Sequence, residues 1–309
     1  MSADPPPEAL VRLVPPPAAR AAVPGMVGYR MPPLPGEHRG FPSPWLTLVF
    51  SLSGALPIAV PDGGRMRSAE FHVPVGGLHT RAVVMPRRLP HAPTADQRGI
   101  QLAVHPLAAR AVFGLPAAAL AGEVLEIDEL VADGAELVAD GPELAARLAG
   151  DRPGGLSGEL SGGLSGAAAT AVVARWLTAR IGAADADPPT PELARAWQVI
   201  VGRHGRVRIG DVAQEVGWSR RHLTTRLRAE IGVGAKDLAR LARFARSREL
   251  IGRRDRSLAQ VAADAGYADQ PHLTTEWREF AGCSPGRWIA QEFPFVQDGD
   301  AARSADSPA

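Results

Sequence analysis

The chain has 309 residues, about twice the usual length of a single domain, so we expect two domains that each bury a core. Its 34 basic and 33 acidic residues leave a net charge of +1, and the one cysteine, Cys283, excludes an internal disulfide and a cysteine-rich zinc site. No apolar run approaches the ~20 residues of a membrane span, and the acidic, proline-rich start Met1–Pro7 does not resemble a secretory signal. We therefore expect a cytoplasmic protein with no membrane partner.

The chain begins with a proline-rich segment and continues with short apolar runs. Pro5–Pro7 and Pro15–Pro17 remove backbone donors, so we predict a disordered arm over residues 1–25. From residue 26 to residue 104, apolar or alternating runs are separated by glycine and proline, which is typical of strands and turns. The predicted strands are Val27–Met31, Trp45–Leu52, Leu56–Val60, Ala69–Val73, Leu78–Met85 and Gly99–Val104. This pattern predicts a small β-barrel or sandwich.

Beyond Pro106 the spacing of apolar residues becomes helical. Gly150–Gly166 is a Gly/Ser/Leu stretch that predicts a flexible linker or loop, and a helix is expected over residues 167–181. We assign residues 26–184 to a β-rich domain with a helical extension, residues 185–295 to an all-α domain and residues 296–309 to a disordered tail. The expected fold class is α+β.

The small net charge conceals an uneven distribution along the chain. The segment Thr190–Ala290 carries 18 Lys/Arg and 11 Asp/Glu, a net charge of +7, which leaves −6 on the rest of the chain. A basic C-terminal third beside an acidic remainder indicates a polyanionic partner for one part only.

The basic segment contains an internal repeat. The sequence HLTT at residues 222–225 recurs at residues 272–275, and Gly232 recurs as Gly282 at the same offset of 50. Upstream, the pattern VA-x-x-VG at residues 212–217 corresponds to VA-x-x-AG at residues 261–266. A repeat that occurs only twice indicates a duplicated supersecondary unit rather than a solenoid.

Each copy has the pattern of a helix, a tight turn and a second helix. In the first copy, Gly217 permits the break between the helices, and Ser219 is a good N-cap for the second one. On the second helix, leucine and isoleucine at residues 223, 227 and 231 share one face. The flanking polar stripe consists of Arg221, Thr224, Thr225 and Arg228 in the first copy and of Pro271, Thr274, Thr275 and Arg278 in the second. An exposed polar stripe on a helix with an apolar back is what insertion into the DNA major groove requires.

The segment from about Gln198 to Glu292 resembles the C-terminal DNA-binding domain of AraC/XylS-type transcriptional regulators. The resemblance is carried by VRIGDVAQEVGWSRRHLTTRLRAEIG, by the joining helix KDLARLARFARSRELI, and by SLAQVAADAGYADQPHLTTEWREFAGCSPGRW. It implies two helix-turn-helix units that meet successive major grooves. The β-rich segment, with EHRGFPSPWLTLVFSL, looks like the cupin-like sensory half found on many such regulators.

The resemblance implies roles for individual residues. The base-reading positions are Arg221, Thr224, Thr225, Gln270, Pro271 and Thr275. The phosphate-contacting positions are Arg220, Arg226, Arg228 and Arg278. Because Pro271 and Glu276 stand on the second outward face, where a cation or an amide is more usual, we expect weaker reading there.

Double-stranded DNA is thus the main expected partner, and a small-molecule effector, a second copy of the chain and, for an activator, RNA polymerase are further ones. No phosphate loop or nucleophile elbow points to an enzyme. The alternative is a cupin-type metal-dependent enzyme or binding module fused to a DNA-binding tail. Five histidines lie in or beside the β-rich part: His38, His72, His79, His91 and His105. Since none are paired in H-x-H or H-x₃-H spacing, we interpret them as turn or surface residues and predict neither a metal site nor a cofactor.

Overall fold

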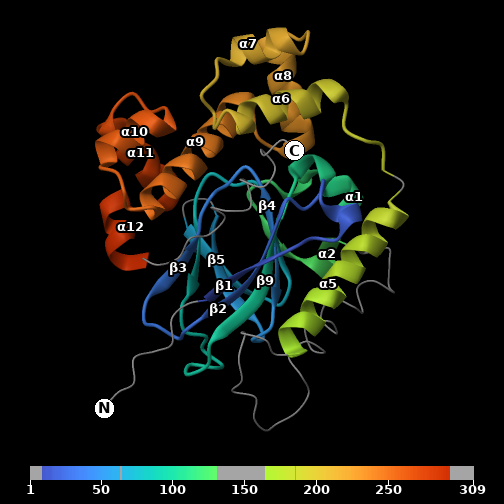
Figure 1. Ribbon diagram of the computed structural model, residues 1–309, viewed down its shortest axis with the longest axis vertical. Helices are drawn as coiled ribbons and strands as arrows, with labels where there is room; N and C mark the ends of the chain where they lie inside the picture. Colours follow the sequence, from blue (N-terminus) through green and yellow to red (C-terminus); the bar gives the residue numbers. More distant parts are fainter. Residues whose placement is uncertain (1–8, 63–64, 131–163, 185, 293–309) are drawn as a thin grey trace.

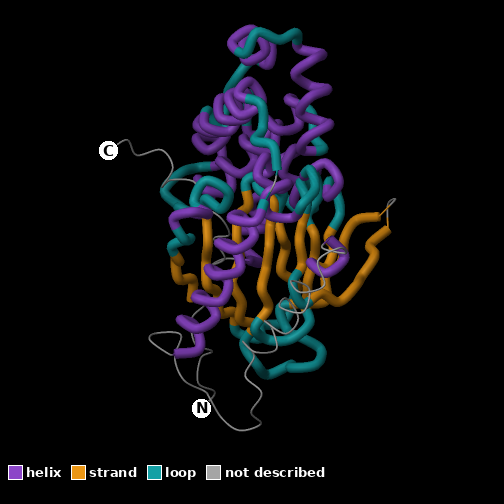
Figure 2. The backbone as a smooth tube through the Cα atoms, turned by 90° about the vertical axis from the view of Figure 1, so that its right-hand side faces the viewer, coloured by secondary structure: helices purple, strands orange, loops and turns teal. Residues whose placement is uncertain are grey.

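The computed structural model describes residues 9–62, 65–130, 164–184 and 186–292. Within these residues the chain forms a β-rich part and an all-helical part, and the helical part sits across one end of the strands (Figures 1 and 2). The expected α+β class is therefore confirmed at the level of these two regions.

The larger sheet has six strands, and all of its neighbouring strands are antiparallel. In spatial order the strands are β1 (Ala9–Leu13), β2 (Gly25–Met31), β9 (Gln97–Val104), β4 (Leu46–Ser51), β7 (Pro74–Gly76) and β10 (Val124–Glu126). The alternating sequence of β4 explains how this sheet packs, because Leu46, Leu48 and Phe50 are buried on one face while the residues between them point to the other.

The smaller sheet has four antiparallel strands. Their order is β3 (Glu37–Gly40), β8 (Val83–Pro86), β5 (Leu56–Asp62) and β6 (Arg65–Phe71). The barrel that the cupin-like resemblance implied is not closed, because the described strands form two separate sheets with free edges. The predicted strand Leu78–Met85 is also too long, since only its end, from Val83, belongs to a strand.

The outer face of the larger sheet is covered by α5 (Leu164–Ala183) (Figure 1). Phe50 of the sheet meets Trp176 of α5 with the two ring centroids 5.6 Å apart and the rings nearly perpendicular. The predicted helix over residues 167–181 is therefore present, and it begins three residues earlier, within the segment assigned to a linker. The rest of that linker lies outside the described residues.

Part of the predicted disordered arm is a strand. Residues 1–8 lie outside the described part, but Ala9–Leu13 form β1, which pairs with β2 along the edge of the larger sheet. The short 3-10 helix η1 (Pro17–Ala19) follows and buries Ala19. In the sequence, β1 lies between two groups of prolines, and as an edge strand it pairs with only one neighbour.

Five short elements follow β9 in the described residues up to Leu130, where the spacing predicts helix. They are η2 (Pro106–Ala108), α1 (Ala109–Phe113), η3 (Ala117–Leu120), the strand β10 and α2 (Ile127–Leu130). The helical prediction is therefore wrong for residues 124–126, which pair with β7. Gly114 ends α1 in the left-handed region, at φ +80°. The apolar residues with helical spacing therefore lie in several short elements.

Residues 186–292, the described stretch of the helical part, contain seven helices. They are α6 (Pro191–Gly202), α7 (Ile209–Glu215), α8 (Arg220–Ile231), α9 (Ala235–Gly252), α10 (Leu258–Ala265), α11 (Gln270–Ala281) and α12 (Pro285–Glu292). Their buried faces are continuous with the buried outer face of the larger sheet, so the two parts share one hydrophobic core. Among the described helices, none is both long and apolar enough to cross a membrane.

Candidate nucleic-acid interface and internal cavity

The first repeat copy folds as α7, a turn and α8. Gly217 lies in the turn at φ +72°, a conformation that glycine adopts without strain. The backbone N–H of His222 donates to the Ser219 side chain over 3.1 Å, which confirms Ser219 as the N-cap of α8. Leu223, Leu227 and Ile231 are fully buried. The apolar back that the sequence predicts is therefore present.

The second copy repeats this geometry in α10 and α11. Gly266 takes the turn position at φ +81°, and the side chain of Asp269 accepts from the N–H of His272 over 2.7 Å. The inward residues Leu273, Trp277 and Ala281 are fully buried. Both units also place an aromatic ring against the histidine that opens the second helix: Trp218 against His222 at 4.8 Å, and Tyr267 against His272 at 5.3 Å.

The predicted DNA-contacting side chains lie on the surface that these buried faces leave outside. All four predicted phosphate contacts are exposed: Arg220, Arg226, Arg228 and Arg278. Of the predicted base-reading residues, Thr224 is partly buried and the others are exposed: Arg221, Thr225, Gln270, Pro271 and Thr275. In each unit the predicted DNA-contacting residues therefore lie on the outward side of the second helix, which is α8 in the first unit and α11 in the second.

The prediction that Glu276 faces outward is wrong. Its side chain is 4% exposed, and its carboxylate accepts from Arg240 Nε of α9 over 2.8 Å, with Arg243 at 3.8 Å. Glu279, one turn later, also pairs with Arg240, over 2.5 Å. One arginine of α9 therefore pairs with two acids of α11, and the buried Glu276 is not part of the outward face.

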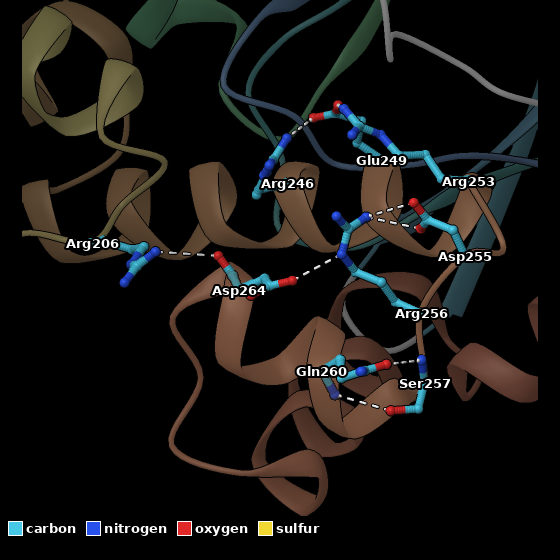
Figure 3. Close-up of polar contacts among 9 residues, drawn as sticks. All are labelled: Arg206, Arg246, Glu249, Arg253, Asp255, Arg256, Ser257, Gln260 and Asp264. Atoms are coloured by element: carbon cyan, nitrogen blue, oxygen red, sulfur yellow. Dashed lines mark hydrogen bonds and ion pairs between the residues drawn. The ribbon is translucent and has the colours of Figure 1, made fainter.

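Helix α9 and its neighbouring turns fix the position of the second unit (Figure 3). Glu249 of α9 is paired with Arg246 over 2.6 Å and also with Arg253. Arg256, in the turn after α9, reaches Asp264 of α10 over 2.9 Å. The capping box of Ser257 and Gln260 starts α10.

A direct contact also joins the two units. Arg206, just before α7, donates from Nη1 to the main-chain oxygen of Asp264 in α10 over 3.4 Å (Figure 3). The same side chain lies against Gly266, where an added Cβ would come within 2.6 Å of Arg206 Cγ. The position of the segment before α7 relative to α10 therefore depends on this glycine as well as on α9.

A cavity of about 240 Å³ lies between the two sheets. The larger sheet contributes the side of its strands opposite to α5, including Tyr29, Val49 and Gln101. The smaller sheet contributes mainly apolar residues, including Ile58 and Met85. The cavity is therefore lined mostly by apolar side chains with a few polar groups, which is the usual character of a small-molecule site.

Two of the histidines that the sequence assigned to turns or the surface line this cavity. Burial lowers the pKa of His38 to about 3, and the charges of Arg87 and Arg248 act in the same direction. Burial also lowers the pKa of His79, although Nδ1 contacts the carbonyl oxygen of Gly77 over 2.9 Å. Both imidazoles are thus neutral at pH 7, and burial raises the pKa of Tyr29, so its phenol is neutral as well.

These histidines do not converge with other ligands. No group of three or more His, Cys, Asp or Glu side chains in the described ranges is arranged to hold a metal ion. His72 is instead an exposed residue whose side chain lies 4.0 Å from Glu126. His91 contacts the carbonyl oxygen of Ser53 over 2.9 Å.

Comparison with known proteins gives one family match. Residues 212–291 match the family described as a helix-turn-helix domain. This segment begins within α7 and ends within α12. No curated protein matches the sequence. The prediction of a duplicated helix-turn-helix module in the basic third of the chain is thereby confirmed.

Several solved structures are similar to the chain or to its helical part. ToxT from Vibrio cholerae bound to an unsaturated fatty acid is 11% identical, with a TM-score of 0.48, over 88% of this chain and 97% of that one. An AraC-type regulator from Chromobacterium violaceum is 24% identical, with a TM-score of 0.32, over 34% and 96% of the respective chains. A DNA-binding dual regulator from Escherichia coli K-12 is 22% identical, with a TM-score of 0.29, over 40% and 100%.

Proposed function

We propose that this chain, a DNA-binding transcription regulator with an AraC-type helix-turn-helix domain, reads two neighbouring major-groove segments with α8 and α11 under the control of a small molecule bound between its sheets. The observation that carries this proposal is the duplication of one surface. In both units an arginine- and threonine-bearing side is exposed over a fully buried apolar back.

The outward residues divide into two functions. Arg221 can read guanine through its planar fork, and the methyl groups of Thr225 and Thr275 can contact thymine. Arg220, Arg226, Arg228 and Arg278 surround these positions and supply sequence-independent attraction to phosphates. Gln270 adds an amide that can pair with adenine, so reading by the second helix depends on Gln270 and Thr275 more than on Pro271.

The effector proposal rests on the cavity. Its lining supports a mainly apolar molecule that makes one or two hydrogen bonds, because His38, His79 and Tyr29 are neutral at pH 7. Arg12 of β1, which is exposed and also lines the cavity, can pair with an acidic group at the rim. A second copy of the chain, and RNA polymerase in the case of an activator, are further proposed partners, and the cytoplasm is the proposed location.

Salt titration of the full-length chain on DNA tests the first half of this proposal. A duplex selected from a random library should bind with an affinity that falls steeply as salt rises, since arginine–phosphate contacts release counterions. Replacing the four phosphate-contacting arginines in turn should reduce the slope by about one each. Binding that is insensitive to salt and shows no preference among duplexes would contradict the proposal.

Ligand binding to the cavity is tested separately. We expect an unsaturated fatty acid, used as an apolar acidic probe, to raise the thermal midpoint of the full-length chain, because a ligand that binds only the folded state stabilises it. Ile58→Asp should abolish this shift, whereas exposed Met66→Asp on the neighbouring strand should leave it intact. An equal response of both variants would exclude the cavity as the binding site of this probe.

A further inference from the structure

The β-rich part contacts the first unit, and α6 just before it, through residues that do not line the cavity. Trp197 of α6 packs against Trp45 and His105, with ring centroids 4.7 Å and 4.1 Å apart. The end of α8 is held by an ion pair between Arg110 and Glu230, whose closest atoms are 3.0 Å apart.

The backbone also approaches closely there. A Cβ added to Gly232, the C-cap of α8, would come within 2.3 Å of Ala121 Cβ in the turn after η3. None of the side chains named in these contacts with the first unit belongs to the lining of the cavity.

The contact with the second unit is different, because Phe41 takes part in this contact and also lines the cavity. Phe41 follows β3, lines the cavity and is 7% exposed. Its ring lies 6.0 Å from Phe244 and 6.0 Å from Trp277, and 5.7 Å from Trp288. The β-rich part therefore places one aromatic side chain among buried rings of α9, α11 and α12.

Phe41 reaches the reading helix itself. Trp277 is the fully buried inward residue of α11, and its indole Nε1 donates to Ser247 Oγ of α9 over 2.8 Å. A hydrogen bond also joins the β-rich part to α11: the backbone N–H of Ala82 donates to the carbonyl oxygen of Phe280 over 2.7 Å. Val83, the residue after Ala82, lines the cavity too.

We infer that Phe41 is a positioning residue for α11, and that the contents of the cavity are transmitted to the second helix-turn-helix unit and not to the first. Packed interiors do not absorb displaced rings, so a molecule that moves Phe41 must move Trp277 or break its contact. Such a molecule changes DNA reading only if it binds the two arrangements with different affinity. This inference rests on the proposed function, since it requires DNA reading by both units.

The test uses the full-length chain and the duplex that it selects from a random library. Arg221→Ala and Thr275→Ala first identify which base pairs each unit reads. Phe41→Leu should then weaken binding to this duplex by about three- to tenfold, the value of an aromatic contact. The loss of base preference should be confined to the half that Thr275→Ala identifies. Phe41→Met, which preserves more of the volume, should act in the same direction with a smaller effect.

Phe50→Leu provides the matched control. Phe50 is also a buried phenylalanine of the β-rich part, and it packs on Trp176 of α5 and does not line the cavity. It should leave base preference unchanged in both halves. The inference would be overturned if Phe41→Leu relaxed base preference in both halves or in neither half. It would also be overturned if Phe50→Leu had the same effect as Phe41→Leu. A wild-type chain that selects no duplex would instead overturn the proposed function.

Discussion

The two helix-turn-helix units share a local sequence pattern and have very different surroundings. Both have a capped reading helix, a left-handed glycine in the turn and a buried apolar back. The corresponding positions 226 and 276, however, hold an exposed arginine in the first unit and a buried glutamate in the second.

The inward positions 227 and 277 differ in the same way. The first unit has a leucine there, and the second has a tryptophan enclosed by rings from α9, α12 and the β-rich part. The two units thus share the HLTT segment and the exposed arginine at positions 228 and 278, while the packing that holds each unit in place differs. The second unit is accordingly the one through which the β-rich part can act.

The largest effect should come from replacing Trp277. Trp277→Ala removes an indole that is fully buried and hydrogen-bonded to Ser247, and should lower the free energy of unfolding by about 3–5 kcal/mol. Leu227→Ala, at the matching place in the first unit, should cost about 2–4 kcal/mol. Urea unfolding of the two full-length variants measures the difference. A smaller cost for Trp277→Ala would contradict the more extensive packing of the second unit.

The next effect concerns the buried acid of α11. Arg240→Met should cost about 3 kcal/mol, since it leaves the Glu276 carboxylate buried without its closest partner. Adding Glu276→Leu to Arg240→Met should restore most of that stability. Arg226→Leu, the exposed counterpart in the first unit, should change stability by less than about 0.5 kcal/mol. Urea unfolding checks all three, and no recovery in the double variant would show that Glu276 is not the cause.

Within the first unit, variants of a base-reading residue and of a phosphate-contacting residue should affect DNA binding differently. Arg221→Ala should weaken binding to the selected duplex by about 1–3 kcal/mol and relax preference at one base pair. Arg226→Ala should instead lower the affinity for selected and random duplexes alike. Titration of each variant against the selected and the random duplex distinguishes the two roles. If each variant weakened binding to both duplexes equally, the assigned roles would be rejected.

The smallest effect is a pH dependence where the β-rich part contacts α6. Burial lowers the pKa of His105 to about 4, against 6.5 for an ordinary histidine. Below pH 6.5 the unfolded chain therefore binds a proton that the folded chain does not, and stability falls progressively until pH reaches about 4. Between pH 7 and pH 6 this amounts to about 0.7 kcal/mol.

His105→Asn isolates this contribution. Asparagine can still accept from the N–H of Leu107, as His105 Nδ1 does over 3.1 Å, but it does not titrate. The free energy of unfolding of this variant should decline less between pH 7 and pH 6 than that of the wild type. Identical pH profiles would show that His105 is not responsible.

The helical part could be predicted well because its signals are local. Caps, turn glycines and apolar spacing lie within each repeat copy, so Ser219, Gly217 and Leu223 could be assigned their places from the sequence. The same spacing could not place Glu276. Its burial depends on Arg240 and Arg243, which precede it by more than 30 residues and belong to another helix.

The β-rich part was predicted less completely, since strand pairing and cavities depend on distant segments. Alternation in β4 predicts a strand, but not which face meets α5 and which faces the cavity. The nearby prolines predict a disordered arm that includes residues 9–13, whereas in the structure these residues pair with β2. Nothing in the sequence around His38 or His79 indicates burial, because the sheets that enclose them come together only in the fold.

The most direct test of the account is to map which base pairs each reading helix specifies. The full-length chain should select a duplex with two blocks of preferred bases, centred about 10 base pairs apart, one helical turn. Arg221→Ala should relax one block, and Thr275→Ala should relax the other. A single block, or two blocks that both variants relax together, would contradict the claim that α8 and α11 read neighbouring major-groove segments.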